Sequence, residues 1–497
     1  MPEIWIHKQM RRCMLSDAGT RNYYLDEDNS LLKQGTSFED NQTAGASTSG
    51  LRVYGSFTAA VGQYLNNVTK GFSAYITAVG AGYVDCKPRF KTMGTNYGDA
   101  TSTTASKLVD SSATFQTDGI QPGQVAVLRD LSDYAVITSV DSETQLSLSK
   151  DLFASGDKYG ITPGFESGDT VQRGTARFDG TDGQCMVEIP KFYVRKEYNP
   201  PAHSWSVSAY PQAGYSLHPA FVKAAGAEAD YLYVSAFEGA DAADLNFNAP
   251  ELTAKNLGSA QMCSLPDRTP VVEGQRGEFR QFAANRGAAW HQWNFAANWA
   301  VQLLFMLEHE TFNSQSIFEG ITNWSSSDRD AIVSNTRNRS VVQSGATLEL
   351  GNASGSSSAS GDAGSYFSYR GIENLYGNIW KYEDGINILD NHPYVAYLPE
   401  DFADDTQANY IDLGVTMPAS NGYQKQIHDV PGLITAEVGA GSNTYLTDYY
   451  YQNPGWRVAV SGGYSLSGSR AGFAARNAFA SSSPRVSYFG SRACVKI

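Results

Sequence analysis

Short segments of alternating apolar and polar residues, separated by turns of glycine, aspartate and serine, recur through most of this 497-residue chain. The clearest series lies between residues 96 and 172. An alternation with a period of two turns one side of each segment toward a core, which is the pattern of a β-strand. The 47 glycines and 29 tyrosines suit loop-rich β-structure better than long helices. The sequence therefore predicts a β-rich fold of the α+β class.

Two stretches in the middle of the chain depart from this pattern and carry the apolar spacing of helices. The first covers residues 273–288, with Phe279 in its apolar stripe and Gly287 as its predicted end. The second covers residues 289–312, and its apolar face starts at Trp293. We expect two helices here, within an otherwise β-rich region.

A chain of this length exceeds what one hydrophobic core supports, so about two to four domains are expected. We predict an N-terminal β-rich region for assembly or attachment at residues 1–95, with a strand at residues 3–7. Residues 96–172 form an inserted small all-β module, and residues 173–497 form a further domain that holds the two helices.

The composition excludes several classes of partner. A formal net charge of −14 argues against nucleic-acid binding. No stretch approaches the roughly 18 apolar residues of a membrane span, and the first residues do not make a convincing signal peptide. The cysteines are odd in number and far apart, which predicts reduced thiols in a protein made in the cytosol; they are Cys13, Cys86, Cys185, Cys263 and Cys494.

Motifs of catalysis are missing from the sequence. It contains no P-loop pattern, no GxGxxG that opens a helix after a strand, no HExxH and no GxSxG. Its seven histidines are dispersed, and no Cys/His cluster is present. We therefore predict a protein that is not an enzyme and that has no catalytic residues, no metal site and no cofactor.

The second half of the chain resembles the C-type-lectin-like fold in the version shared with formylglycine-generating enzymes. Three segments carry this resemblance, namely residues 278–315, residues 370–385 and residues 455–497. The middle segment contains the Gly-Asn-hydrophobic-Trp pattern of the family as Gly377, Asn378, Ile379 and Trp380. The resemblance implies a C-type-lectin-like ligand-binding domain over residues 173–497.

The enzymes of that family use two cysteines just after a Gly-Gly pair. In this sequence Gly462 and Gly463 are followed by Ser467 and Gly472 where those cysteines would fall. This departure argues against a formylglycine-type oxidase, which we keep as the second alternative.

Five further segments share a second pattern, namely residues 13–30, 179–197, 203–221, 231–239 and 369–388. On these segments, most of residues 1–30 and 175–497 resembles a family of phage and prophage tail-associated proteins. This resemblance implies a receptor-binding adhesin of a tail fibre or tail tip, located in the virion and synthesised in the bacterial host cytoplasm. It implies a host-surface protein or glycan and other tail proteins as partners, and a homotrimer. Some relatives are variable proteins of diversity-generating retroelements, which implies a variable segment at residues 461–491. The first alternative is a structural tail or collar component without host contact.

The segment from residue 461 to residue 497 contains no acidic residue and mixes serine with tyrosine, phenylalanine and arginine. Such a mixture suits a binding surface of rigid aromatic anchors and adaptable polar contacts. A terminal strand pair that only completes a sheet is the alternative, and it explains Val458, Val460 and Val495. The predicted ligand-binding residues are Tyr464, Ser465, Ser467, Ser469, Arg470, Phe473, Phe479, Ser482, Arg485, Ser487 and Tyr488.

Overall fold

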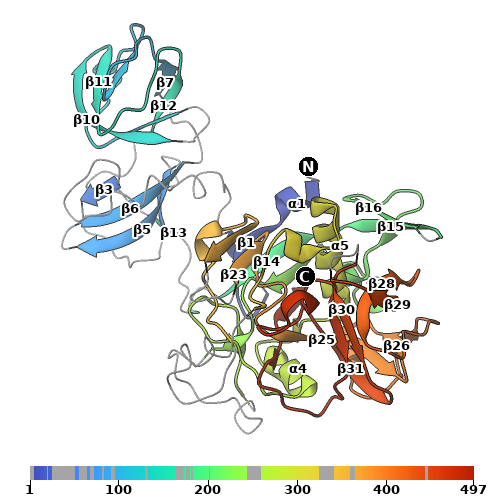
Figure 1. The fold of residues 1–497 in the computed structure, drawn as a ribbon. Coiled ribbons are helices and arrows are strands. Elements are labelled where there is room, and N and C mark those ends of the chain that lie inside the picture. The colour runs from blue at the N-terminus through green and yellow to red at the C-terminus, as the bar shows by residue number, and fades with distance from the viewer. Residues whose placement is uncertain are drawn as a thin grey trace. The chain divides into compact units, whose positions relative to one another are not determined.

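The chain forms two compact units in a computed structural model (Figure 1). Unit 1 consists of Met1–Tyr24 and Phe178–Ile497, and unit 2 of Leu25–Arg177. The structure describes residues 5–19, 21–24, 51–54, 64–67, 72–80, 83–90, 96–128, 133–162, 172–174, 180, 183–200, 202–242, 259–323, 341–358, 364–442 and 446–497.

The described residues of unit 2 form two antiparallel sheets. One has the order β7-β12-β9-β10-β11-β8 and consists of β7 Asn96–Asp99, β8 Lys107–Val109, β9 Val125–Leu128, β10 Tyr134–Ser142, β11 Gln145–Leu148 and β12 Lys158–Thr162. The other has the order β13-β4-β5-β6-β3 and consists of β3 Leu51–Tyr54, β4 Tyr64–Asn67, β5 Phe72–Gly80, β6 Tyr83–Phe90 and β13 Gln172–Gly174.

The strands predicted from the alternating segments after residue 96 are confirmed. In β11 the burial alternates along the strand, and its inward residues Leu146 and Leu148 pack with Leu108 and Ile137 in one cluster. Alternation with a period of two is therefore the cause of this small core. The domain boundaries at residues 95 and 172 remain predictions.

The first sheet of unit 1 joins both ends of the described chain. Its order is β2-β1-β14-β18-β34-β21, with β1 Arg11–Leu15, β2 Arg21–Tyr24, β14 Gln184–Pro190, β18 Tyr231–Ser235, β21 Trp290–Gln292 and β34 Ala493–Lys496. In β34, Val495 lies opposite Tyr233 on one side and Trp290 on the other. Residues far apart in sequence thus share one sheet.

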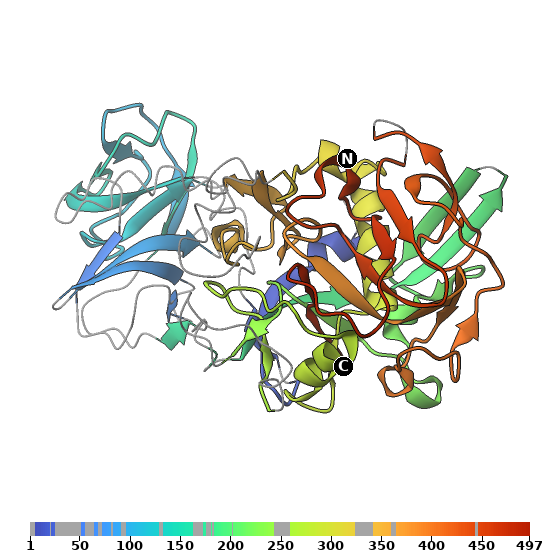
Figure 2. The same cartoon turned by 60° about the horizontal axis from the view of Figure 1, so that its bottom comes forward.

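The second sheet of unit 1 carries the C-terminal segment. Its path is β27-β26-β25-β31-β32-β30-β28-β29, and β33 pairs in parallel with β25. The strands drawn in orange and red lie side by side in Figures 1 and 2. They are β25 Trp380–Leu389, β26 His392–Val395, β27 Ile411–Asp412, β28 Gly422–Ile427, β29 Thr435–Ala440, β30 Tyr449–Gln452, β31 Trp456–Ser461, β32 Arg476–Ala478 and β33 Phe489–Gly490.

Smaller sheets and 3-10 turns complete unit 1. The strands are β15 Tyr193–Asn199, β16 Ala202–Ser208 and β17 Ser216–Leu217; β19 Ala240–Asp241 and β20 Met262–Cys263; and β22 Gly355–Ser358, β23 Ser365–Tyr369 and β24 Ile372–Glu373. The 3-10 turns are η1 Pro219–Phe221, η2 Ala224–Gly226, η3 Ser314–Ser316, η4 Leu348–Leu350, η5 Pro399–Asp401 and η6 Gly468–Arg470.

The two predicted helices are confirmed as α4 Arg276–Ala284 and α5 Phe295–His309, but both are shorter than expected. Helix α5 begins late because Asn294 caps it, its Oδ1 accepting a hydrogen bond from the Ala297 N–H at 3.0 Å. The residues before Asn294 form β21 instead, since they pair with β34. Their predicted helical conformation was wrong.

Helix α4 ends before Gly287, the predicted stop. The Asn285 amide donates to the Ala260 carbonyl at 2.8 Å, and Arg286 Nε donates to the Met262 carbonyl at 2.6 Å. These side-chain contacts tie the end of α4 to the segment around β20. The predicted strand at residues 3–7 was also wrong, because Trp5–Gln9 form the short helix α1. None of the described helices is both long and apolar enough to cross a membrane.

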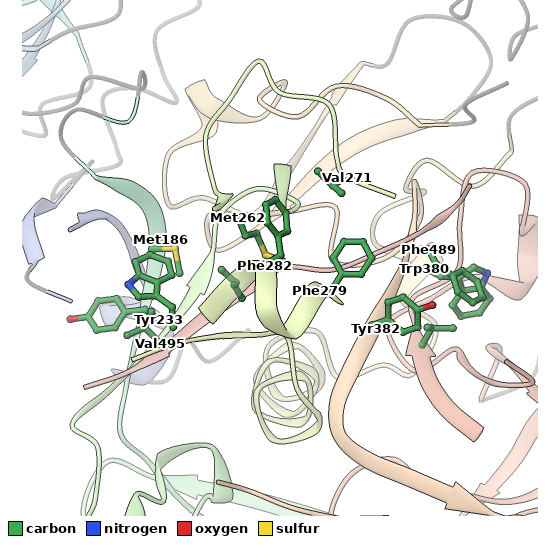
Figure 3. Close-up of a cluster of buried hydrophobic side chains, with 14 of the residues drawn as sticks. Met186, Tyr233, Met262, Val271, Phe279, Phe282, Trp380, Tyr382, Phe489 and Val495 are labelled. Carbon is green, nitrogen blue, oxygen red and sulfur yellow. The ribbon is translucent and has the colours of Figure 1, made fainter. Parts of the chain in front are cut away.

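A hydrophobic core in unit 1 joins the two sheets to helix α4 (Figure 3). Trp380, Tyr382 and Phe489 lie together in Figure 3, and Phe279 of α4 reaches the Tyr382 ring at 5.7 Å between centroids. Phe279 is fully buried, as its place in the predicted apolar stripe requires, and Phe282 is fully buried too. This core supports the strands from which the C-terminal loops leave.

Candidate binding surface

Strand β30 presents tyrosines to two opposite sides. Tyr450 is fully buried and packs in a core with Ala459 and Ala478, whereas Tyr449 and Tyr451 are half-buried. Successive side chains of a strand point to opposite faces, so Tyr449 and Tyr451 share the outward face. The parallel pairing of β30 with β32 brings this face next to the C-terminal segment.

An arginine of the C-terminal segment lies against these rings. The Arg470 guanidinium lies over the Tyr449 ring at 5.2 Å and forms a hydrogen bond with the Tyr451 side chain. Tyr423 of β28 contacts the Tyr449 ring at 5.0 Å, and its hydroxyl shares a 2.8 Å hydrogen bond with the Ser469 hydroxyl. Arg470 and Ser469 are both exposed. Cation–π contact and hydrogen bonding therefore orient the arginine while it stays accessible.

A second pair of rings adjoins the first. Tyr464 and Tyr488 stack with centroids 4.2 Å apart and an interplanar angle of 22°. Tyr451 contacts the buried Trp380 ring edge-on, with the ring centroids 6.1 Å apart. The backbone N–H of Trp380 donates a hydrogen bond to the backbone carbonyl of Tyr488 at 2.9 Å. Burial raises the pKa of Tyr464. The neighbouring Tyr488 and Tyr451 raise this pKa further, whereas the charge of Arg470 lowers it.

We call the set Tyr423, Tyr449, Tyr451, Tyr464, Tyr488 and Arg470 the tyrosine patch. Its tyrosines are all half-buried. Burial raises the pKa of Tyr451 and Tyr464, so these phenols keep their protons at neutral pH. The patch thus offers aromatic faces, neutral hydroxyls and one cation, which can stack on and hydrogen-bond to a ligand.

The loop that carries Tyr464 and Arg470 is fixed from within. Gly472 has φ of +150°, and a Cβ there would collide with the Asp448 carboxyl. That carboxyl accepts a hydrogen bond from the Ala474 N–H at 2.8 Å. Ser467 closes the turn, its N–H donating to the Tyr464 carbonyl and its Oγ accepting from the Tyr464 N–H, both at 2.9 Å. The backbone beneath the patch is therefore held by buried groups.

The predicted ligand-binding residues occupy three kinds of position. Tyr464, Ser469, Arg470 and Tyr488 lie in or directly beside the tyrosine patch. Phe479 is 55% exposed, and Ser487 is half-buried. Ser465, Ser467 and Phe473 have exposed fractions of 0%, 8% and 1%, so their side chains pack inward and face no ligand in this conformation.

Phe473 and Arg485 show why exposure could not be read from residue type. The Phe473 ring stacks on Phe305 of α5 at 5.2 Å, which makes it part of the core. Arg485 forms an ion pair with Glu278 of α4, and Ser482 donates to Asp405 at 2.5 Å. Arg485 and Ser482 thus tie the loop after β32 to the body of unit 1.

Sequence reasoning missed Tyr423, Tyr449 and Tyr451. A signal was present in the run Tyr449-Tyr450-Tyr451, because a strand with this sequence must turn two tyrosines to one side. The position of these tyrosines beside Arg470 depends on the pairing of β30 with β32. In the sequence, β31 and the loop that carries Arg470 lie between these two strands.

The cysteines Cys13, Cys185, Cys263 and Cys494 are buried. Burial raises the pKa of the Cys263 thiol to about 12 and also raises that of Cys494. Within the described ranges, no group of three or more His, Cys, Asp or Glu side chains could hold a metal ion.

No protein-family model matches the chain, and no curated protein matches it. Among solved structures, the Major Tropism Determinant M1 variant is similar over 89% of this chain and 96% of its own, with 11% identity and a TM-score of 0.26. The Major Tropism Determinant U1 variant covers the same shares with 11% identity and a TM-score of 0.24.

Proposed function

We propose that this chain is a phage receptor-binding protein of the tail, which binds a host-surface protein or glycan through the tyrosine patch. The observation that carries the proposal is the gathering of half-buried tyrosines around the exposed Arg470. Side chains of Tyr464, Tyr449 and Tyr423 come from separate elements, yet they meet in one surface. The proposal assigns no catalytic step to the chain.

The chemistry of the patch supports recognition of a surface ligand. Tyrosine supplies a large contact area at a small cost in conformational entropy, and arginine adds a fixed fork of hydrogen-bond donors. The stack of Tyr464 on Tyr488 limits the motion of both rings before any ligand arrives. Such preorganisation lowers the entropy that binding must overcome.

The division of the C-terminal segment into anchored and exposed positions supports a variable segment at residues 461–491. Arg470, Ser469 and Phe479 are exposed, and their side chains can change without opening the core. Two other positions tolerate substitution less freely. Gly472 lies against Asp448, and the buried Arg492 donates a hydrogen bond to the Ser235 carbonyl at 3.1 Å. We infer that a diversity-generating retroelement acts on the exposed positions.

A C-type-lectin-like framework over residues 173–497 is part of the proposal. Asn378 of the Gly-Asn-Ile-Trp segment has φ of +57° and accepts a hydrogen bond from the Val342 N–H at 2.8 Å. Trp380 is buried under Tyr451. This segment therefore works as a support beneath the tyrosine patch, which suits a fold that presents variable loops on a rigid base.

We also propose that the protein is a homotrimer in the virion tail, in contact with other tail proteins, because repeated weak sites gain avidity. Sedimentation equilibrium of the purified full chain tests the trimer, and an antibody against the chain tests its position on virions. A monomeric mass in sedimentation, or antibody bound to the virion away from the tail, would contradict this part of the proposal.

The test of the function is adsorption of the purified, labelled full chain to bacteria that the corresponding phage infects. The triple variant Tyr464→Ala, Arg470→Ala and Tyr488→Ala should lose at least about tenfold in apparent affinity. Tyr210→Ala is the matched control, since Tyr210 is 70% exposed and lies outside the patch. It should adsorb like the unchanged chain.

Two results would reject the proposal. One is adsorption of the triple variant at the level of the unchanged chain, when circular dichroism shows that both proteins are folded. The other is no adsorption of the unchanged chain while an antibody locates it in the tail. The second result would favour the alternative of a structural tail or collar component.

A further inference from the structure

A cavity of about 790 Å³ lies in unit 1 and shares no residue with the tyrosine patch. One wall is helix α4, with Arg280 and Ala284, and another is the turn around Pro399. Trp290 and His291 of β21 and Lys496 of β34 also line it. Its size lies within the range of roughly 300–1,000 Å³ that small-molecule sites occupy.

The cavity contains a cation that backbone carbonyls hold and on which the charge of Glu400 acts. The Lys496 amine donates to the Tyr397 carbonyl at 2.7 Å and to the Val222 carbonyl at 3.3 Å. Among the described residues no carboxylate forms an ion pair with it. An ammonium has three donors, so one donor and the charge remain for a ligand. Glu400, the acidic residue that lines the cavity, is exposed.

A second cation is fixed in the wall. Arg280 Nε donates to one Asp384 oxygen at 2.6 Å, and its Nη2 donates to Asp384 at 2.8 Å and to Asp404 at 2.9 Å. These bonds set the plane of the guanidinium and leave its Nη1 group without a hydrogen bond to the described residues. An oriented guanidinium edge suits a carboxylate.

His291 supplies a group of a different kind. It is 5% exposed, and its Nε2 has no hydrogen-bond partner among the described residues. Its Nδ1 lies 3.3 Å from the Ala289 carbonyl, which favours the tautomer with the proton on Nδ1. Burial, and then the charge of Lys496, lower the pKa of His291 to about 3, so the ring is neutral and Nε2 is an acceptor. An acceptor of this kind requires a donor such as a hydroxyl.

We propose that this cavity binds a small hydroxylated carboxylate of the sugar-acid class, with its carboxylate at Lys496 and Arg280 and a hydroxyl at His291. The apolar lining from Phe402 and Leu398 suits the C–H face of a sugar ring. Burial lowers the pKa of Lys496 to about 8, which leaves the amine charged at neutral pH. The ligand class follows from the three polar groups taken together.

Calorimetry of the purified full chain with three ring compounds tests the proposal. D-glucuronate has both the carboxylate and the hydroxyls, D-glucose has only hydroxyls, and cyclohexanecarboxylate has only the carboxylate. We expect D-glucuronate to bind at least about tenfold more tightly than D-glucose, which lacks the charge-assisted hydrogen bonds of the carboxylate. It should bind at least about threefold more tightly than cyclohexanecarboxylate, which lacks the hydroxyl that bonds to the neutral His291. Equal affinity for D-glucuronate and cyclohexanecarboxylate would overturn the proposal, as would no binding of D-glucuronate at about 10 mM.

Two variants assign the binding to this cavity. Lys496→Met should weaken D-glucuronate binding about tenfold or more. The control is Lys425→Met, which removes an exposed lysine that pairs with Glu437 at 2.6 Å. Ala284→Phe fills the cavity from an exposed position of α4 and should abolish binding without altering the core. Unchanged affinity in either Lys496→Met or Ala284→Phe would overturn the assignment.

Discussion

The Asp448 carboxyl occupies the space that a Cβ at Gly472 would fill. Asp448 is 2% exposed, and it holds the loop by accepting a hydrogen bond from the Ala474 N–H. A buried carboxyl and a glycine without a side chain therefore fit together beneath the tyrosine patch. This fit makes the loop sensitive both to substitution and to protonation.

The first prediction concerns Gly472→Ala. The new methyl group would meet the Asp448 carboxyl, so we expect the free energy of unfolding to fall by about 2 kcal/mol or more. Gly414→Ala separates this collision from backbone strain, because Gly414 has φ of +67° with nothing within 4 Å of its Cβ position. Gly414→Ala should cost about 1 kcal/mol. Urea denaturation measures both, and equal losses would contradict the steric argument.

The second prediction concerns pH. Burial raises the pKa of Asp448 to about 7 from its ordinary value of 3.8. The folded state therefore binds a proton that the unfolded state has lost, and this group's contribution to stability is complete below pH 3.8 and disappears as the pH rises through 7. Asp448→Asn should remove that slope, which amounts to roughly 2–4 kcal/mol. Unfolding free energies between pH 4 and pH 8 decide this, and parallel curves for the two proteins would contradict it.

The third prediction separates the two faces of β30. Tyr450→Ala should cost about 3–5 kcal/mol, since it empties a fully buried site. Tyr449→Ala, on the outer face, should cost less than about 1 kcal/mol. The buried Tyr450 hydroxyl has no hydrogen-bond partner among the described residues, so Tyr450→Phe should be neutral or stabilising. Chemical denaturation of the three variants checks the assignment, which a large loss for Tyr449→Ala would disprove.

The fourth prediction concerns tolerance within residues 461–491. Ser469→Ala and Phe479→Ser change exposed positions and should alter the free energy of unfolding by no more than about 0.5 kcal/mol. Phe473→Ala lies in the same segment but removes the ring that stacks on Phe305, and it should cost about 3–5 kcal/mol. Thermal or urea melts compare the three, and similar losses at all of them would argue against a segment built for variation.

Local patterns in the sequence predicted much of the fold and part of the candidate site. Period-two alternation identified the strands around Leu108, Ile137 and Leu146, because each of those strands has one buried side. The helical spacing found α4 and α5 but placed the start of α5 too early, since β21 forms only through pairing with the distant β34. The helix propensity of a short stretch of sequence contains no information about a strand partner that is distant in the sequence.

The candidate site, like the fold, was predicted where local sequence patterns decide the structure and missed where distant contacts decide it. Tyr464, Arg470 and Tyr488 were predicted from the composition of the segment, and they lie in the tyrosine patch. Ser467 and Phe473 have the same residue types as exposed neighbours, but a turn and a packed helix bury them. Residue type alone does not separate these cases, because burial depends on the path of the loop.

The pairing of β1 with β14 has a consequence for how such a chain can evolve. Cys13 lies opposite Met186, so the sheet of unit 1 closes across the long stretch of sequence that forms unit 2. In that sheet, the whole of unit 2 is a single insertion between β2 and β14, which lie on either side of β1. Recombination can exchange or remove such a cassette without altering the register of β1 and β14, so one scaffold can be combined with different modules while the tyrosine patch stays the same.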